Sequence, residues 1–178
     1  MRRLGLALAL LAGAFAARAE PEPAVSSVVL RVTITTRDIE AARRFYVEGL
    51  GYAVRYDGDI TTPEGRVLLG LKQGERARFV VLDSSQAPPG TSGDGAGVGL
   101  LSVTRRGLAA QRHPHGNALA SGEAMLAVKT SNLAAVIGRL QRLGVSILAG
   151  PVTGHGGHQI EIVVRDPDGT RIHIVEER

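Results

Sequence analysis

Glu161 and His173 can transfer protons or bind metals, and both are predicted to lie on one face of two adjacent strands. The apolar residues at even positions of 159–164 should face the core, which turns Gln159 and Glu161 to the opposite face. A short turn with a glycine bulge places His173 on that same face. A carboxylate beside an imidazole can act as a general base or supply two metal ligands. Alternatively, Glu161 and His173 simply hydrogen-bond to each other or to Arg171.

Two further pairs of histidines lie in predicted loops. His113 and His115 flank a proline, and His155 and His158 lie in a glycine-rich segment before the strand that bears Glu161. Paired imidazoles can bind transition metals or exchange protons, but neither pair has the spacing of a known metal motif. The glycine-rich segment is the better candidate for a functional site, because it leads into the strand that bears Glu161 and could form a mobile lid over a cavity there.

Other short motifs have simpler explanations than a functional site. The segment 57–59 lacks most oxygen ligands of a calcium loop and is interpreted as a hairpin turn. The glycines of 93–97 lack the strand, helix and acid of a dinucleotide site. The pairs Ser26-Ser27 and Ser84-Ser85 have no spaced base and acid that would indicate a nucleophile. The chain contains no cysteine, which excludes disulfides and thiol catalysis.

The elements that would position these side chains occur twice along the chain. The first copy begins with an alternating strand over 28–36, followed by a helix that Asp38 caps and the turn 49–51 ends. Three β-type runs follow, at 52–56, 66–71 and 78–82. The run 98–104 is either an added edge strand or the true fourth strand of this copy, with 78–82 then part of a longer hairpin.

The second copy repeats this plan. A strand over 124–128 leads to a helix capped by Thr130, Ser131 or Asn132, which ends at a Leu-Gly pair. Three strands follow, at 145–148, 159–164 and 171–175. Each copy therefore has the order βαβββ. Because a helix covers only one face of a sheet, we expect an α+β fold in which the two copies pair into a half-barrel around a central cavity.

Residues 1–19 have the features of a secretory signal peptide. Arg2 and Arg3 precede a short apolar run, and the segment ends in a small-x-small cleavage site. The run is shorter than the roughly 20 residues of a spanning helix. An uncleaved anchor is the alternative. Cleavage would leave a single domain over 28–178, periplasmic or secreted and not attached to a membrane.

The charge and composition argue against a nucleic-acid partner. Signal cleavage removes three arginines and no acid, so the formal charge falls from +4 to +1. The whole chain has no Trp, three Phe and three Tyr, and no basic run interleaved with aromatic residues. A stacking platform for nucleic acid is therefore not supported.

Two motifs near the ends of this domain match those of a known family. The first is Asp38, Phe45-Tyr46 and Leu50-Gly51 after a strand, and the second is the segment 165–169 followed by Ile172. Together they resemble the vicinal-oxygen-chelate superfamily of glyoxalases, bleomycin-resistance proteins and extradiol dioxygenases. The resemblance divides the domain into one copy at about 28–104, a linker at about 105–122 and a second copy at about 123–178. It does not fix the reaction, since this fold hosts isomerases, dioxygenases, thiol transferases and drug-sequestering proteins.

The resemblance also implies where a metal would lie. Enzymes of this superfamily hold a divalent metal with side chains from four equivalent strands, and three of these positions match Arg31, Glu123 and His173, with the fourth near Val81. Glu123 and His173 give only two donors, so a Zn, Ni, Fe or Mn ion bound by them would have an incomplete ligand set, which Glu161 could complete in a shifted site. Arg31 keeps its charge, so we expect it to form a salt bridge with Glu123 where relatives hold metal.

Three functions remain open. We favour a binding protein that encloses a small oxygenated or anionic molecule. The side chains expected to bind this molecule are Arg31, Gln159, Glu161 and Arg171. The alternative is a metal-dependent lyase, isomerase or dioxygenase in which Glu123 or Glu161 is the base and His173 a ligand. A structural or interaction domain has no specific support. The copies could pair within one chain or in a homodimer.

Overall fold

The computed structural model describes residues 29–84, 97–104, 116–154 and 157–177. The predicted signal peptide and His113, His115 and His155 lie outside these ranges. The elements are β1 (Arg31–Thr35), α1 (Ile39–Arg44), η1 (Phe45–Gly49), β2 (Tyr52–Asp59), α2 (Pro63–Leu68), β3 (Ala77–Ser84), β4 (Gly97–Val103), β5 (Met125–Thr130), α3 (Leu133–Arg142), β6 (Ile147–Thr153), β7 (Gln159–Arg165) and β8 (Arg171–Glu177). Within the described ranges, none of the helices has the length and apolarity to cross a bilayer.

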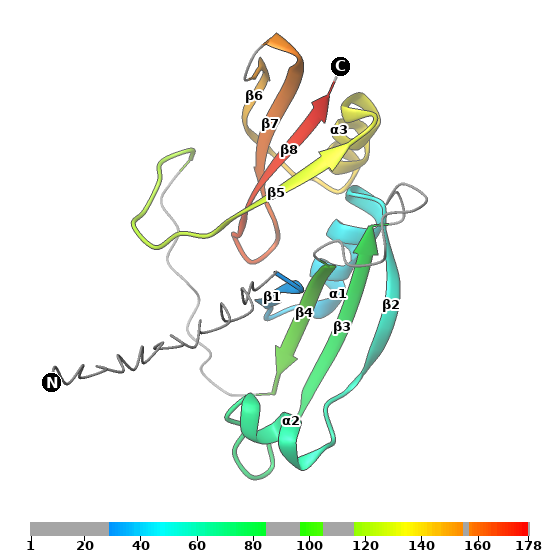
Figure 1. Cartoon of the computed structure of the whole chain (residues 1–178), viewed down its shortest axis with the longest axis vertical. Helices are drawn as coiled ribbons and strands as arrows, with labels where there is room; N and C mark the ends of the chain where they lie inside the picture. The colour runs from blue at the N-terminus through cyan, green and yellow to red at the C-terminus, as the bar shows by residue number, and fades with distance from the viewer. Residues whose placement is uncertain (1–28, 85–96, 105–115, 155–156, 178) are drawn as a thin grey trace, which may run out of the picture.

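The strands form two four-stranded sheets with the same topology. Sheet A has the order β1-β4-β3-β2, and sheet B has the order β5-β8-β7-β6. In each sheet the first strand is parallel to the last, and the other neighbours are antiparallel. Figure 1 shows sheet B in the upper half of the view and sheet A in the lower half. The predicted α+β fold of two paired βαβββ modules is confirmed.

In each module the helix that follows the first strand begins at a side-chain cap. Asp38 accepts hydrogen bonds from the backbone N–H groups of Glu40 and Ala41, at 3.1 and 2.9 Å. The helix α1 then continues as the π-helical turn η1 before the chain turns at Gly51, where φ is +85°. In the second module Asn132, one of the three predicted caps, accepts from the N–H of Ala135 at 2.9 Å.

The two modules share one hydrophobic core. It joins the helix-covered faces of both sheets and includes Phe45 and Tyr46 from η1 and Val136 and Leu140 from α3. Gly49 lies where η1 meets α3, and a Cβ there would lie 2.9 Å from the side chain of Leu140 and 3.3 Å from that of Leu143. The modules are therefore joined through the close packing of their helices.

Three predictions about the first module are settled by the strand pairing. The run 98–104 is the true fourth strand, because β4 pairs with both β1 and β3. The prediction of a strand over 66–71 is wrong: Thr62 caps α2 through the N–H of Gly65 at 3.2 Å, and Pro63 occupies its first turn. The segment 57–59 is not a hairpin turn, since it continues β2 opposite β3.

Candidate functional site

The candidate side chains lie on the faces of the sheets that turn away from the shared core. In β7, Ile162 and Val164 are buried in that core, so Glu161 lies on the opposite face. In β8, Ile172 and Ile174 are buried in the same way, which places Arg171 and His173 beside Glu161. The alternation predicted from the sequence for these two strands is confirmed.

Glu161 and His173 form a pair on this face of sheet B. The Nε2 atom of His173 lies 2.9 Å from Oε2 of Glu161, and the side chains are 23% and 11% exposed. The residues that pair with His173 on the neighbouring strands are Ala127 and Val163, which are small or apolar. The imidazole therefore has a carboxylate on one side and an apolar surround, an arrangement suited to holding one tautomer.

The backbone at Gly154, directly after β6, lies against this pair. A Cβ on Gly154 would lie 1.6 Å from Oε1 of Glu161, far inside contact distance. Glycine at this position thus allows the chain to cover the carboxylate. His158 in the β6–β7 connection is exposed, and its predicted pair with His155 lies outside the described residues.

Glu123 belongs to a separate ionic cluster at the β7–β8 end of sheet B. Its Oε1 lies 2.5 Å from an Nη1 donor of Arg165 and 3.6 Å from Nε of Arg171. The Glu123 side chain is 5% exposed, and the hydrogen bond from Arg165 lowers the pKa of its carboxyl below the ordinary value. Glu123 is therefore a carboxylate at neutral pH.

Arg171 is engaged by the chain itself. Its guanidinium donates to Oδ1 of Asn117 and, at 2.7 Å, to the carbonyl of Ala118. The residue is 2% exposed. Arg171 is predicted from the sequence to bind the ligand, and in the structure it contacts residues that precede β5. Whether Arg171 also binds a ligand stays a prediction.

Arg31 lies on the outer face of sheet A. Its guanidinium carbon is 5.5 Å from the centroid of the Phe79 ring, within the range of a cation–π contact. Gly99 lies opposite Thr33 in the register, and a Cβ on Gly99 would lie 2.8 Å from both Phe79 and Thr33. This glycine leaves room for the Phe79 ring beside β4, and the exposed Arg31 lies over that ring.

The predicted salt bridge between Arg31 and Glu123 is wrong. Arg31 has no ion pair with Glu123 among the residues that the structure describes, because Glu123 reaches the arginines of its own sheet. Arg165, which the sequence analysis did not single out as a site residue, takes the place expected for Arg31. The alternation of side chains along β7 could have predicted this, because Arg165 is four residues after Glu161 and so lies on the same face of the strand.

The donors on sheet B do not fit a three-ligand divalent metal site. The described part of the chain contains no group of three His, Cys, Asp or Glu side chains that could hold a metal ion. Glu161 and His173 supply two donors, whereas Glu123 lies beside two guanidinium groups whose charge opposes a cation. At the fourth position, Val81 is apolar and 7% exposed. The metal assignment to Glu123 and His173 stays a prediction.

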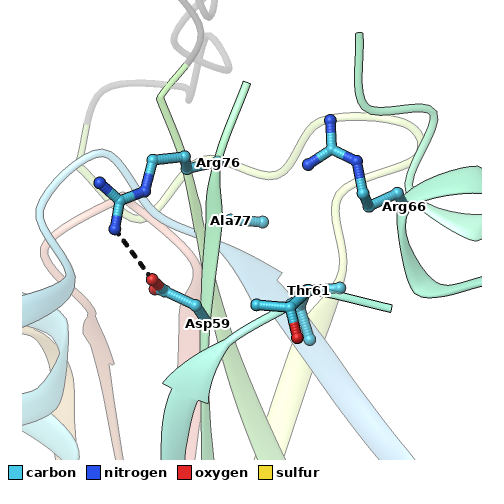
Figure 2. Close-up of a pocket in the computed structure, with 6 residues that line it drawn as sticks. Asp59, Thr61, Arg66, Arg76 and Ala77 are labelled. Carbon is cyan, nitrogen blue, oxygen red and sulfur yellow. Dashed lines mark hydrogen bonds and ion pairs between the residues drawn. The ribbon is translucent and has the colours of Figure 1, made fainter. Parts of the chain in front are cut away.

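A hollow of about 220 Å³ lies elsewhere, between the end of β2, α2 and the start of β3. Figure 2 shows the Arg76 guanidinium directed at Asp59, to which it donates at 3.1 Å. Arg66 donates to the carbonyls of Lys72 and Glu75. Both cations thus have partners that fix the chain around α2, and we assign this hollow a structural role.

The chain belongs to the Glyoxalase/Bleomycin resistance protein/Dioxygenase superfamily, whose family model matches residues 28–174. A comparison with curated proteins finds no match. The resemblance inferred from the two sequence motifs is therefore confirmed at the level of the superfamily.

Several solved structures share the fold. A glyoxalase family protein from Bacillus cereus is 16% identical with a TM-score of 0.65, and the match covers 87% of this chain and 99% of that chain. The trypanothione-dependent glyoxalase I of Leishmania major is 20% identical with a TM-score of 0.55, covering 85% and 88%. An antibiotic-binding protein from Streptomyces sp. CB03234 is 22% identical with a TM-score of 0.52, covering 88% and 100%. At these identities the likeness shows the fold alone.

Proposed function

We propose that this chain is exported and binds a small oxygenated or anionic molecule, with a degenerate metal site. The main support for this proposal is that Glu123 forms ion pairs with Arg165 and Arg171 and is therefore not available as a metal ligand. The outer faces retain groups suited to organic ligands, namely a cation over an aromatic ring on sheet A and a carboxylate–imidazole pair on sheet B. A protein of the same fold that binds an antibiotic gives the proposal a precedent.

Arg31 is the anchor we propose for the anionic group of the ligand. It is exposed, and Phe79 beneath it offers a flat apolar surface beside the charge. A guanidinium donates two parallel hydrogen bonds to a carboxylate, and the ring can stack against an aromatic group. An aromatic carboxylate such as benzoate combines both features and is the simplest probe.

The test is calorimetric titration of the protein with benzoate. Removing a charge-assisted hydrogen bond should weaken binding by roughly tenfold or more, so Arg31→Met should lose affinity by that factor. Arg142→Met, an exposed arginine on the last turn of α3, is the matched control and should bind as the wild type does. Equal affinity in the wild type and Arg31→Met would disprove the role of Arg31, and no binding of any aromatic anion would disprove the function.

We also infer that a second copy of the chain encloses the ligand. In one chain the outer-face side chains of β1 and β5 are exposed, namely Arg31, Thr33, Thr35, Met125, Ala127 and Lys129. A ligand pocket normally buries most of its ligand, which these exposed faces do not achieve in a single chain. Analytical ultracentrifugation should therefore show a dimer, and a monomer at all concentrations that still binds ligand would contradict this inference.

The pair of Glu161 and His173 favours a second candidate, a metal-dependent lyase, isomerase or dioxygenase. It places a base and a nitrogen donor 2.9 Å apart on one face. The third ligand that this candidate needs, Glu123, is held by two cations instead. We therefore prefer the binding protein, and metal analysis separates the two candidates.

A further inference from the structure

Two arginines lie directly opposite each other on neighbouring strands of sheet B. Arg165 at the end of β7 pairs with Arg171 at the start of β8, and their side chains are 15% and 3% exposed. Like charges in opposed positions of a sheet repel, and burial limits the screening by water. This pair therefore requires an anion between the two guanidinium groups.

The anion comes from outside the sheet. Glu123 lies two residues before β5 in a segment that we call the strap, residues 116–124. Figure 1 shows the strap in yellow-green, entering β5 beside the β7–β8 turn. Arg171 also binds Asn117 and Ala118 near the other end of the strap. The two arginines thus hold the strap at both ends, while Leu119 between them is 76% exposed.

The fit of Glu123 to the arginines is incomplete. Its Oε1 faces both guanidinium groups, but Oε2 accepts from the N–H of Ala120 within the strap, at 3.2 Å. As a result, the buried Nε–H of Arg171 has no hydrogen-bond partner among the described residues and lies 3.6 Å from Oε1. A guanidinium favours two carboxylate oxygens at once, so a carboxylate with both oxygens available would match the pair better.

We propose that Arg165 and Arg171 form a carboxylate-binding site that the chain fills with its own Glu123, so that the strap competes with the carboxylate of a small ligand. This inference rests on the proposed binding function. The site lies on the same face as His173, two residues or roughly 7 Å along β8. A ligand carboxylate of small organic size can therefore reach the arginines while the rest of the molecule contacts His173 and Ala127.

The first test asks whether the arginines accept an external carboxylate. In Glu123→Ala the pair loses its anion, and sodium acetate at constant ionic strength should raise the melting temperature along a saturable curve, by about 2 to 4 °C. The wild type, whose site is filled, should respond less to the same acetate. The double variant Glu123→Ala/Arg171→Met should lose the response, because one of the two cations is absent.

The matched control is Glu177→Ala, which removes a carboxylate that pairs with the exposed Lys129. Its acetate response should be no greater than that of the wild type. If Glu123→Ala does not fold, Glu123→Gln keeps the shape of the side chain without its charge and should still show a smaller acetate response. The proposal would be overturned if acetate raised the melting temperature of Glu123→Ala, or of Glu123→Gln in its place, no more than that of the wild type.

The second test asks whether a ligand displaces the strap. The chain has no cysteine, so Leu119→Cys can carry a single fluorophore whose anisotropy reports the mobility of the strap. Saturating sodium acetate at constant ionic strength should lower the anisotropy in the otherwise wild-type chain, and Glu123→Ala should lower it without acetate. Unchanged anisotropy in saturating acetate would overturn the competition between strap and ligand.

The two tests separate this inference from the proposed function. Benzoate binding through Arg31 with a strap that acetate does not loosen would leave the binding function standing and remove the competition. An acetate response in Glu123→Ala with no binding of any aromatic anion to the wild type would show the arginine site and disprove the binding function, and with it the strap as a competitor for a ligand.

Discussion

The phenol of Tyr46 donates a 3.0 Å hydrogen bond to Oδ2 of Asp166, 120 residues further along the chain. Tyr46 is fully buried in η1 of the first module, and Asp166 lies in the β7–β8 turn of the second. The other oxygen of Asp166 accepts from the N–H groups of Asp168 and Thr170. One carboxylate thus shapes the turn and also joins the modules.

The change Tyr46→Phe should lower the free energy of unfolding by about 1 to 3 kcal/mol, because it leaves a buried carboxylate oxygen without its donor. Urea unfolding of the two proteins measures the difference. Tyr56→Phe is the control, since Tyr56 is 46% exposed and should change stability by less than about 0.5 kcal/mol. Equal effects of the two changes would contradict the role given to Tyr46.

Asp166 should make stability depend on pH with a defined sign. Burial raises the pKa of its carboxyl above the ordinary value. The folded state therefore holds this proton more tightly than the unfolded state, and the stability contributed by the protonated group is lost as pH rises through the folded pKa. From about pH 4 to 7, wild type should lose stability relative to Asp166→Asn. Parallel stability curves for the two proteins would rule this out.

The change Gly154→Ala should disrupt the pair of Glu161 and His173, because the new methyl group overlaps the Glu161 carboxylate. Long-range ¹H–¹⁵N correlation spectra of the imidazole report its tautomer and should change for His173. Gly138→Ala on α3 is the control: its Cβ meets only Arg142, at 3.7 Å, and it should stabilise the helix by roughly 0.5 to 1 kcal/mol. An unaltered His173 spectrum in Gly154→Ala would show that the carboxylate is not held as described.

Metal analysis should separate the two candidate functions. The protein without residues 1–19, purified and then dialysed with Zn, Ni, Fe or Mn, should hold far less than one ion per chain, because only two donors converge at Glu161 and His173. Mass spectrometry of the metal content measures this. Stoichiometric metal that is lost in both Glu123→Ala and His173→Ala would instead favour the metal-dependent enzyme.

Much of the fold could be predicted because both modules contain the same local signals. Asp38 and Asn132 cap their helices, and the alternation in β7 and β8 placed Glu161 and His173 on one face. The helix α2 was missed because Val67 and Leu68 suggested a strand. In the structure these two residues are 79% and 85% exposed, so no buried face favours a strand at this position. The Thr62 cap and Pro63 at the start of α2 favour a helix instead.

The ionic contacts of the site could not be predicted to the same degree. The sequence placed Glu123 and Arg31 at equivalent strand positions of the two modules. Which arginine pairs with Glu123 depends on which one lies nearest to it in the folded chain. Glu123 precedes β5, and the register that sets Arg165 opposite Arg171 brings two guanidinium groups to it. Such register follows from turn geometry and packing, which a count along one strand does not give.

The close approach at Gly49 bears on what either half of the molecule could do in isolation. With η1 pressed against α3 through a bare backbone and Arg139 donating to the carbonyl of Gly49 at 2.9 Å, each half would present an apolar helix surface to water if severed from the other. Fragments cut in the linker should therefore aggregate when expressed singly and regain solubility when expressed together, as complementary pieces of one folding unit.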